Sequence, residues 1–440
     1  MAIRSGLLIL TFTFPVFAAP QIQHWQTANG AGVYFVEAHE LPMVDIKVTF
    51  DAGSARDPRD KKGLSAMTNS LLADGAAGLN ADQISYEFER LGAGFGANAG
   101  IDSASVSLRS LVERNKLDPA LVNLGKVMTK PDFPPSAVER QRKRFLIGIQ
   151  QKQQSPAAVA SEAFYAAIYG DHPYAYPSKG SELSITSINR AEIAEFHRQY
   201  YVARNATVAI VGDLDREAAR KLAEELTESL QNGNKAKPLP AVPDLLESKE
   251  IRRAHPSTQI HILLGQPGMK RGDPDYFSLY VGNHILGGSG LVSLLFKEIR
   301  EKRGLSYSAY SYFSLMRENG PFLAGLATRA DQAAEALEVL RENIRSFIKN
   351  GPGPAVLESA KKNITGGFPL RIDSNSNLLG YAAVIGFYKL PLDYLETFTA
   401  KVDAVSIEDI RDAFRRRIAP DKLVTVMVGP DNVPPSMESN

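Results

Sequence analysis

The chain of 440 residues contains no cysteine. This absence excludes disulfides, thiolate nucleophiles and thiolate metal sites, and it also excludes a lipoprotein anchored through an N-terminal cysteine. An excess of charge is lacking as well, because 50 basic residues stand against 49 acidic ones. A near-neutral chain has no electrostatic footprint for nucleic acid or for an anionic membrane surface. We therefore expect neither as a partner.

Long apolar runs are also lacking, except at the N-terminus. There, one early positive charge, Arg4, precedes an apolar run over residues 6–14 and the small residues Ala18 and Ala19. This order predicts a secretory signal peptide over residues 1–18, because the apolar run is too short to span a bilayer. An uncleaved membrane anchor is the alternative. Export of a chain without cysteine favours a bacterial periplasm, so we expect a periplasmic protein without a membrane span after cleavage.

The rest of the chain reads as two similar halves. The alternating segment Val44–Phe50 corresponds to Gln259–Leu264, and the apolar segment Ala206–Asp213 corresponds to Leu423–Pro430. The helical stretches between these points also match in their apolar periodicity. Duplication of one domain explains the pattern, and two similar domains without a common origin are the alternative.

Each half mixes alternating strands with amphipathic helices, without the regular strand–helix alternation of a doubly wound fold. This mixture predicts the α+β class, with two homologous domains that are each a mostly antiparallel sheet covered by helices. A proline-rich stretch over residues 232–248 predicts an exposed linker. We expect an N-terminal domain over residues 20–231 and a C-terminal domain over residues 249–433.

Three kinds of segment then point to one family. The sequence contains Phe50–Pro58 followed by Gly63-Leu64, His197–Asn205 before a Val-Gly-Asp strand end, and Ile285–Gly288 followed by Leu295–Tyr307. Together they resemble the pitrilysin, or insulinase-like, zinc metallopeptidases in their small bacterial two-domain form. The resemblance extends over about residues 22–432.

The resemblance implies a zinc motif, His-x-x-Glu-His, on a helix directly after Gly63-Leu64. Histidines at positions i and i+4 share one helix face and can hold Zn²⁺, while the glutamate takes a proton from zinc-bound water. In this chain the histidine positions hold Ala66 and Ser70, and the glutamate position holds Asn69. The third ligand of the family, a glutamate, falls near residues 145–149, where no acid is present.

This degenerate motif leads us to expect no metal bound by this chain and no catalytic residue of its own. The alternative is a relocated metal site assembled by folding. The segment keeps a helical apolar stripe of Leu64, Met67, Leu71 and Leu72, which predicts a helix over residues 64–73 whose buried face packs the core.

A second element of the family lies in the C-terminal half. The resemblance implies that an arginine and a tyrosine seven residues apart reach the active site, and Arg300 and Tyr307 match this pair. A guanidinium and a phenol can both donate hydrogen bonds to a peptide carbonyl or its oxyanion. The structural alternative is that Arg300 favours a helix C-terminal dipole and Tyr307 is a half-buried strand aromatic. The neighbouring Arg303 does not have the family spacing.

Two further segments have weaker signals. Residues 94–108 match a strand to which, the resemblance implies, substrate adds as an extra strand, and an ordinary hairpin is the alternative. The glycine-rich run over residues 287–290 lacks the lysine–serine ending of a phosphate loop, so we expect a hinge or a turn.

The resemblance includes paired subunits, in which one chain carries the zinc motif and the other keeps only the Arg–Tyr pair. This predicts a non-catalytic, substrate-binding subunit of a periplasmic heteromeric zinc metallopeptidase. Arg300 and Tyr307 are then contributed in trans to the zinc site of a paralogous partner in a heterodimer that encloses a peptide substrate. The alternatives are a peptide-binding or scaffold protein with no role in proteolysis, and an independent peptidase with a relocated metal.

Overall fold

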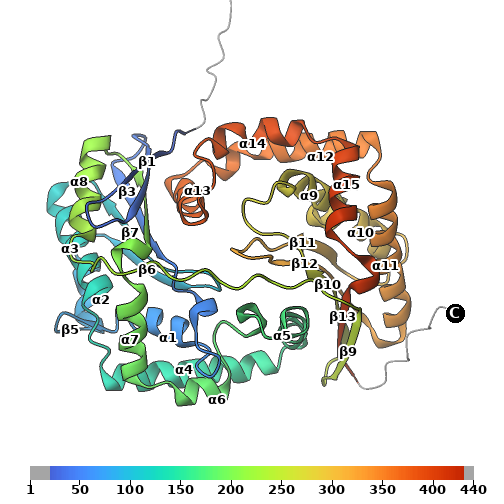
Figure 1. The fold of residues 1–440 in the computed structure, drawn as a ribbon, viewed down its shortest axis with the longest axis horizontal. Coiled ribbons are helices and arrows are strands. Elements are labelled where there is room, and N and C mark those ends of the chain that lie inside the picture. Colours follow the sequence, from blue (N-terminus) through green and yellow to red (C-terminus); the bar gives the residue numbers. More distant parts are fainter. Residues whose placement is uncertain (1–19, 431–440) are drawn as a thin grey trace, which may run out of the picture.

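The structure, a computed structural model, describes residues 20–430 (Figure 1). The predicted signal peptide over residues 1–18 lies outside the described residues, as does the end of the predicted C-terminal domain. Two mixed sheets stand on opposite sides of the molecule, one built from each half of the chain (Figure 1). Within residues 20–430, no helix is both long and apolar enough to cross a membrane.

The sheet of the N-terminal half has the strand order β1-β2-β8-β3-β7-β6. Its strands are β1 (Gln23–Gln26), β2 (Gly32–Glu37), β3 (Met43–Phe50), β6 (Gly94–Ala99), β7 (Ala104–Leu111) and β8 (Ala206–Gly212). Only β2 and β8 run parallel, and every other neighbouring pair is antiparallel. A separate small hairpin joins β4 (Gly75–Ala76) to β5 (Leu79–Asn80).

The sheet of the C-terminal half has the order β11-β12-β10-β13-β9. Its strands are β9 (Lys249–Ala254), β10 (Gln259–Pro267), β11 (Ala309–Phe313), β12 (Pro321–Arg329) and β13 (Val424–Gly429). Again one pair, β13 with β9, is parallel and the others are antiparallel. Apart from β1, the two sheets match strand for strand in order and direction. This confirms the predicted fold class and agrees with two duplicated domains.

Helices cover both sheets. The N-terminal half contributes α1 (Leu64–Ser70), α2 (Ala81–Glu89), α3 (Arg114–Thr129), α4 (Pro135–Gln153), α5 (Pro156–Tyr169), α6 (Glu182–Ser187), α7 (Arg190–Tyr200) and α8 (Arg216–Thr227). The C-terminal half contributes α9 (Tyr276–Asn283), α10 (Leu294–Phe296), α11 (Ala333–Asn350), α12 (Pro354–Gly367), α13 (Asn375–Tyr388), α14 (Tyr394–Asp403) and α15 (Ile407–Arg417). Side-chain caps begin several of them, such as Asn80 at α2 and Ser406 at α15, each in a capping box.

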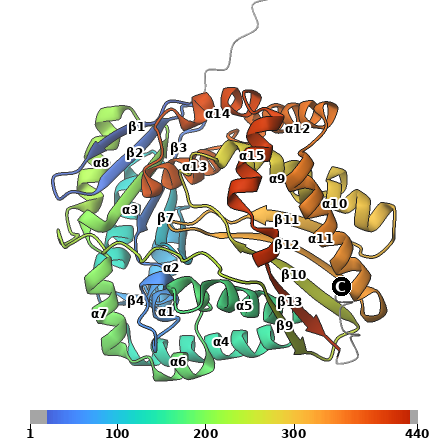
Figure 2. The same ribbon diagram turned by 45° about the vertical axis from the view of Figure 1, so that its right-hand side comes forward.

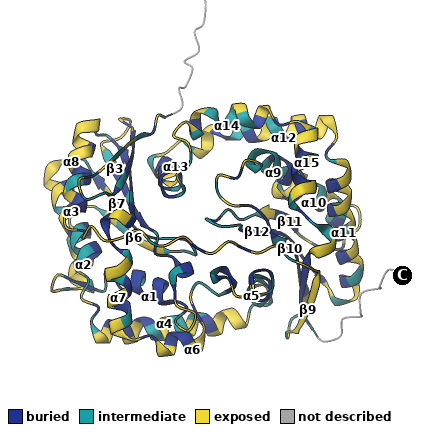
Figure 3. Ribbon diagram, in the orientation of Figure 1, coloured by how far each residue is buried: buried dark blue, intermediate teal, exposed yellow. Residues whose placement is uncertain are grey.

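The two halves exchange one helix each. Helix α13 of the C-terminal half packs on β2, β3 and β8 of the N-terminal sheet, and α5 of the N-terminal half packs on β10 and β13 of the C-terminal sheet (Figures 1 and 2). Alternate residues of β2 therefore enter different cores: Val33 and Phe35 pack with the N-terminal helices, whereas Tyr34 and Val36 pack with α13. Both faces of the central strands of each sheet are buried, so neither half has a complete core of its own, whereas the edge strand β9 is largely exposed (Figure 3).

The segment between the halves is not a freely exposed linker. Residues 232–248 form no helix and no strand, as expected, but Leu239 and Val242 are buried in the cluster that includes α5 and β13. The Ala236 N–H donates to Asn205, and the Lys237 carbonyl accepts from Arg56. The prediction of exposure is wrong at these positions, because the segment runs across the junction of the two halves and closes it. The domain boundaries stay a prediction, because α5 and α13 each pack on the sheet of the opposite half.

Candidate functional site

Helix α1 is fixed at its beginning by a glycine and a buried carboxylate. Gly63 has φ of +95°, and a Cβ there would meet Ile185 and the Lys179 carbonyl at 2.6 and 2.8 Å, so only glycine fits this position. The Asp57 carboxylate accepts hydrogen bonds from the N–H groups of Gly63 and Ser65, both at 2.8 Å. The carboxylate thereby satisfies two N–H groups that the first turn leaves free. Burial nevertheless raises the pKa of Asp57 to about 7.

The helix keeps the predicted core face but is shorter than predicted. Leu64, Met67, Leu71 and Leu72 are all buried in the N-terminal core, which confirms the predicted stripe. The helix ends at Ser70 rather than at residue 73. The N–H groups of Leu71 and Leu72 bond to the carbonyls three residues earlier, which tightens the last turn and ends the helix.

The degenerate zinc-motif positions lie in this helix, and none of the three offers a metal ligand. Ala66 is buried and presents only a methyl group. Asn69 is 2% exposed, and its amide donates to the Tyr201 hydroxyl at 3.1 Å and to the Ser105 carbonyl at 3.3 Å. The Ser70 hydroxyl donates to the Met67 carbonyl in its own helix at 2.9 Å. A hydrogen-bonded amide and hydroxyl and a methyl do not fit a zinc ion.

The third position of the motif supplies no ligand either. It falls on α4, where Phe145 and Leu146 pack against the N-terminal core. The polar contact between α4 and the end of α1 is made instead by Gln141, which donates to Asp74 at 3.1 Å. Over residues 20–430, no three or more His, Cys, Asp or Glu side chains gather closely enough to hold a metal ion. The residues present at the family position therefore do not fit zinc, and no hydrolytic step can be derived through it.

The structure brings Arg300 and Tyr307 together. Arg300 lies in η6 (Lys297–Glu301), a π-helical turn, and its guanidinium stacks 4.3 Å from the centre of the Tyr307 ring and 4.8 Å from the Phe296 ring. Tyr307 is 78% exposed, so it is not the half-buried strand aromatic of the structural alternative. Arg300 itself is half-buried, and within the described residues its guanidinium makes no hydrogen bond and no ion pair. The pair presents a cation and a phenol on one surface.

Arg303 has a different environment. Its guanidinium donates to the carboxylate and the backbone carbonyl of Glu298, at 2.9 and 2.8 Å, and Lys302 donates to the same carboxylate. Hydrogen bonds from Lys302 and Arg303 lower the pKa of Glu298. Arg303 is therefore held by a local ion pair, which distinguishes it from Arg300.

The two weaker sequence segments have clear structures. Strand β6 is the outer strand of its sheet, so its free edge is available, although peptide addition there stays a prediction. The glycine-rich run forms the end of a π-helical turn, η4 (His284–Gly288), and the start of η5 (Gly290–Val292). This agrees with a turn. A Cβ at Gly287 would lie 2.4 Å from the Ser311 backbone, so close packing requires glycine there.

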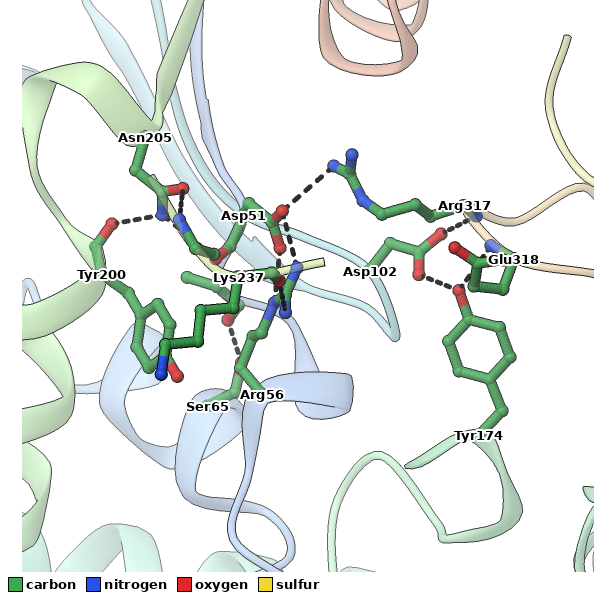
Figure 4. Close-up of polar contacts among 12 residues, drawn as sticks. Asp51, Arg56, Ser65, Asp102, Tyr174, Tyr200, Asn205, Lys237, Arg317 and Glu318 are labelled. Atoms are coloured by element: carbon green, nitrogen blue, oxygen red, sulfur yellow. Dashed lines mark hydrogen bonds and ion pairs between the residues drawn. The ribbon is translucent and has the colours of Figure 1, made fainter. Parts of the chain in front are cut away.

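A buried polar junction joins the two halves, and sequence reasoning did not find it. Asp102, in the β6–β7 turn, accepts hydrogen bonds from the Tyr174 hydroxyl at 2.6 Å, the Tyr388 hydroxyl at 2.8 Å and the Arg317 N–H at 2.7 Å. Tyr388 ends α13 and Arg317 lies in the β11–β12 loop, so Asp102 ties elements of both halves. Figure 4 shows the contacts of Asp102 with Tyr174 and Arg317. Burial, and then the charge of Asp102, raise the pKa of both tyrosines, which stay protonated donors.

A second carboxylate continues this junction. Asp51 accepts two hydrogen bonds from Arg56, at 2.7 and 2.8 Å, and lies 3.3 Å from the Arg317 guanidinium (Figure 4). Arg317 in turn stacks on the Phe387 ring at 4.5 Å. Asp51 and Arg56 lie in a segment that carried the family resemblance, but Arg317, which ties Asp51 to the other half, is far away in the chain. Only the residue types, not the pairing, were visible in the sequence.

Comparison with known proteins agrees with this geometry. The family model "Insulinase (Peptidase family M16)" matches residues 33–181, and the model "Peptidase M16 inactive domain" matches residues 187–364. The crystal structure of a peptidase M16 inactive domain from Pseudomonas fluorescens is 38% identical, with a TM-score of 0.90, and the match covers 94% of this chain and 99% of that one.

Two curated relatives are more distant. An uncharacterized zinc protease, YmxG of Bacillus subtilis, is 23% identical over 417 residues, which are 94% of this chain and 100% of that protein. The non-peptidase homolog YmxG of Helicobacter pylori is 24% identical over 384 residues, 86% of this chain and 87% of that protein. One name states a protease and the other a non-peptidase, so the question of activity has to be argued from the residues of this chain.

Proposed function

The chain belongs to the insulinase family of peptidases, M16, and from this premise we propose that it is a non-catalytic, substrate-binding subunit of a periplasmic heteromeric zinc metallopeptidase. The coarser statement, a non-catalytic protein of this family, agrees with the inactive-domain match and with the non-peptidase relative. The finer role rests on one observation: α1 offers no ligand, while Arg300 is stacked on Tyr307, whose side chain is exposed.

The first part of the argument concerns what α1 does. Asn69 and Tyr201 are hydrogen-bonded to each other in the core, and Ala66 is buried with only a methyl group. The helix is retained because its apolar face packs the sheet. Without a metal there is no activated water, and within this chain nothing at this position generates a nucleophile.

The second part concerns what the Arg–Tyr pair offers. Stacking on Phe296 and Tyr307 orients the Arg300 guanidinium without using its N–H donors. Those donors and the Tyr307 hydroxyl can bind a peptide carbonyl, and they bind more strongly as the carbonyl gains negative charge in the transition state. A pair that binds a carbonyl but cannot attack it suits a subunit whose partner carries the zinc and the general base.

The partner we propose is a paralogous chain with an intact His-x-x-Glu-His motif, and zinc is bound there. The two chains form a heterodimer around an unfolded peptide in the periplasm, which this chain reaches through the predicted signal peptide. A scaffold or peptide-binding role without proteolysis is the competing outcome of the test.

The experiment measures cleavage of a quenched fluorescent peptide library by a zinc-motif paralogue from the same organism, with and without this chain. We expect the chain to raise the rate. Arg300→Ala should remove roughly 2.7–4 kcal/mol of transition-state stabilisation if it replaces an oxyanion donor, which is a loss of about a hundredfold or more from the stimulated rate. Tyr307→Phe, which keeps the ring and deletes the hydroxyl, should lose part of the stimulation.

Arg303→Ala is the matched control, because it removes an arginine three residues away that is already paired with Glu298. It should leave the stimulation nearly intact. If the two proteins bind but the rate does not change, the chain is a scaffold. If Arg303→Ala and Arg300→Ala lose the same amount, the assignment of the pair is wrong.

A further inference from the structure

A cavity of about 760 Å³ lies at the junction of the two halves. Its walls come from β1 and β2, from linker residues 235–239, from the β11–β12 loop and from the residues that end and follow α13. Pockets that bind small molecules span roughly 300–1,000 Å³, so this cavity is large enough to hold most of a small ligand. Neither the degenerate α1 site nor the Arg300–Tyr307 pair lines it.

The charge of the lining is strongly one-sided. Two acidic side chains, Asp51 and Glu318, face six basic ones. The basic residues are Arg56, Arg204, Lys235, Lys237, Arg317 and Lys389. Asp51 is already neutralised, because it accepts two hydrogen bonds from Arg56 and forms an ion pair with Arg317. The potential inside a cavity with such walls favours an anion.

Lys389 is held in a conformation that lysine adopts at a cost. It ends α13 with φ of 54° and ψ of 46°, in the left-handed region where glycine is the usual residue. The Lys389 side chain is exposed and makes no hydrogen bond or ion pair within residues 20–430. Two backbone hydrogen bonds of a helix C-cap fix this conformation, from the Lys389 N–H to the Gly386 carbonyl and from the Leu390 N–H to the Ile385 carbonyl. Lys389 thereby lines the cavity, and its ammonium group stays available to a ligand.

Arg317 is fixed in place from several sides. Its N–H donates to Asp102, and its guanidinium lies 4.5 Å from the Phe387 ring and 3.3 Å from Asp51. Figure 4 shows this side chain reaching from the β11–β12 loop toward Asp51. Because one carboxylate is shared by two guanidinium groups, the site keeps an excess of donors and positive charge. An ordered guanidinium loses little conformational entropy when it binds a carboxylate.

The remaining wall is mainly apolar, although His24, Gln26, Asn205 and Thr207 also line it. Tyr34, Leu239, Phe387, Leu390 and Leu392 line the same cavity. A few convergent cations against a largely apolar wall are typical of a site for an amphipathic anion rather than for a bare inorganic ion.

We propose that this cavity binds an organic anion, with a carboxylate near Arg317 and Lys389 and an apolar body against Tyr34, Leu390 and Leu392. The carboxylate can come from the free C-terminus of a short peptide or from an aliphatic acid. The inference rests on the cavity alone and not on the role proposed in proteolysis, so either can fail without the other.

The test is a fluorescence titration of the mature chain with dansyl-Ala-Leu carrying a free C-terminal carboxylate, beside the same dipeptide as its C-terminal amide. Decanoate serves as an unlabelled competitor. We expect the carboxylate to bind at least about tenfold more tightly than the amide, since one hydrogen bond to a charged group is worth roughly 1.5–3 kcal/mol.

Lys389→Gly is the decisive variant. It removes the ammonium and relieves the backbone strain, so we expect affinity for the free carboxylate to fall about tenfold while the melting temperature stays equal or rises. Arg317→Gln should weaken binding as well. Ala77→Gly is the matched control: Ala77 is also left-handed, with φ of 51°, but does not line the cavity, so only the melting temperature should change.

The competition experiment distinguishes the two sources of the carboxylate. Displacement of the dipeptide by decanoate identifies an apolar carboxylate in general as the ligand, and failure of decanoate to compete identifies a peptide C-terminus. Both support the proposal. Equal affinity for acid and amide, unchanged binding in Lys389→Gly, or no saturable binding of any carboxylate overturns it.

Discussion

Replacing Asp102 by alanine should weaken the coupling between the two halves of the molecule, so that they unfold in separate transitions. Asp102 is 5% exposed and accepts three hydrogen bonds, one from the N-terminal half, at Tyr174, and two from the C-terminal half. Asp102→Ala leaves the buried Arg317 N–H and two tyrosine hydroxyls without this acceptor. A buried donor without a partner costs roughly 1–3 kcal/mol, and water entering the vacated space recovers part of it. We expect a loss of about 3–5 kcal/mol in the free energy of unfolding.

The assay can use the single tryptophan of the chain. Trp25 lies in β1, so its fluorescence reports on the N-terminal sheet, while circular dichroism reports on both halves. In urea, the two signals should change together in the wild type, because α5 and α13 make the cores interdependent. In Asp102→Ala, both midpoints should fall and the two transitions should move apart.

Asp45→Ala provides the control for this experiment. Asp45 is also buried and binds Arg109 through two hydrogen bonds at 2.7 and 2.8 Å, but both residues belong to the N-terminal sheet. Arg109 is half exposed and regains water, so the loss should be about 1 kcal/mol and the transitions should stay together. A shift for Asp102→Ala below about 1 kcal/mol, or coincident transitions, would refute the view that this carboxylate couples the halves.

Two further predictions concern the degenerate site and its neighbour. Asn69→Ala should destabilise the chain by about 1–3 kcal/mol, because it leaves the buried Tyr201 hydroxyl unpaired. In urea unfolding, the double variant with Tyr201→Phe should lose clearly less free energy of unfolding than the sum of the losses of the two single variants. Burial lowers the pKa of His197, so its neutral form stabilises the fold above the unfolded value near 6.5 and this contribution is lost as the pH falls below it. The free-energy advantage of the wild type over His197→Gln should therefore shrink between pH 7.5 and 5.5; an advantage independent of pH would contradict a neutral buried imidazole.

The periodicity of apolar residues predicted much of the fold, because it can be read directly from the sequence. The alternating segments at residues 44–50 and 259–264 are β3 and β10, each paired with neighbours on both sides. The stripe from Leu64 to Leu72 is core, as its spacing indicated. The end of α1 at Ser70 was not predictable, since the bonds that close its last turn depend on how the following residues pack.

The candidate site divides in the same way. The absence of ligands at residues 66, 69 and 70 is a statement about residue types, and the sequence states it directly. The hydrogen bond from Asn69 to Tyr201, 132 residues away, depends on which residues meet in the fold, and only the structure shows it. Arg300 and Arg303 are the same residue type, three positions apart. Their environments differ because Glu298 binds Arg303 and not Arg300.

By itself, then, the sequence determined what depends on residue type and short-range spacing: two α+β halves, no cysteine chemistry, and no zinc ligands on α1. Tertiary structure decided what depends on distant partners. It placed α13 on the sheet of the opposite half, joined Asp102 to Tyr388, and built a cation-lined cavity from β1, the linker and the end of α13. The physical reason is that hydrogen bonds, ion pairs and cavities are properties of pairs and groups of residues, and chain folding alone determines which residues meet.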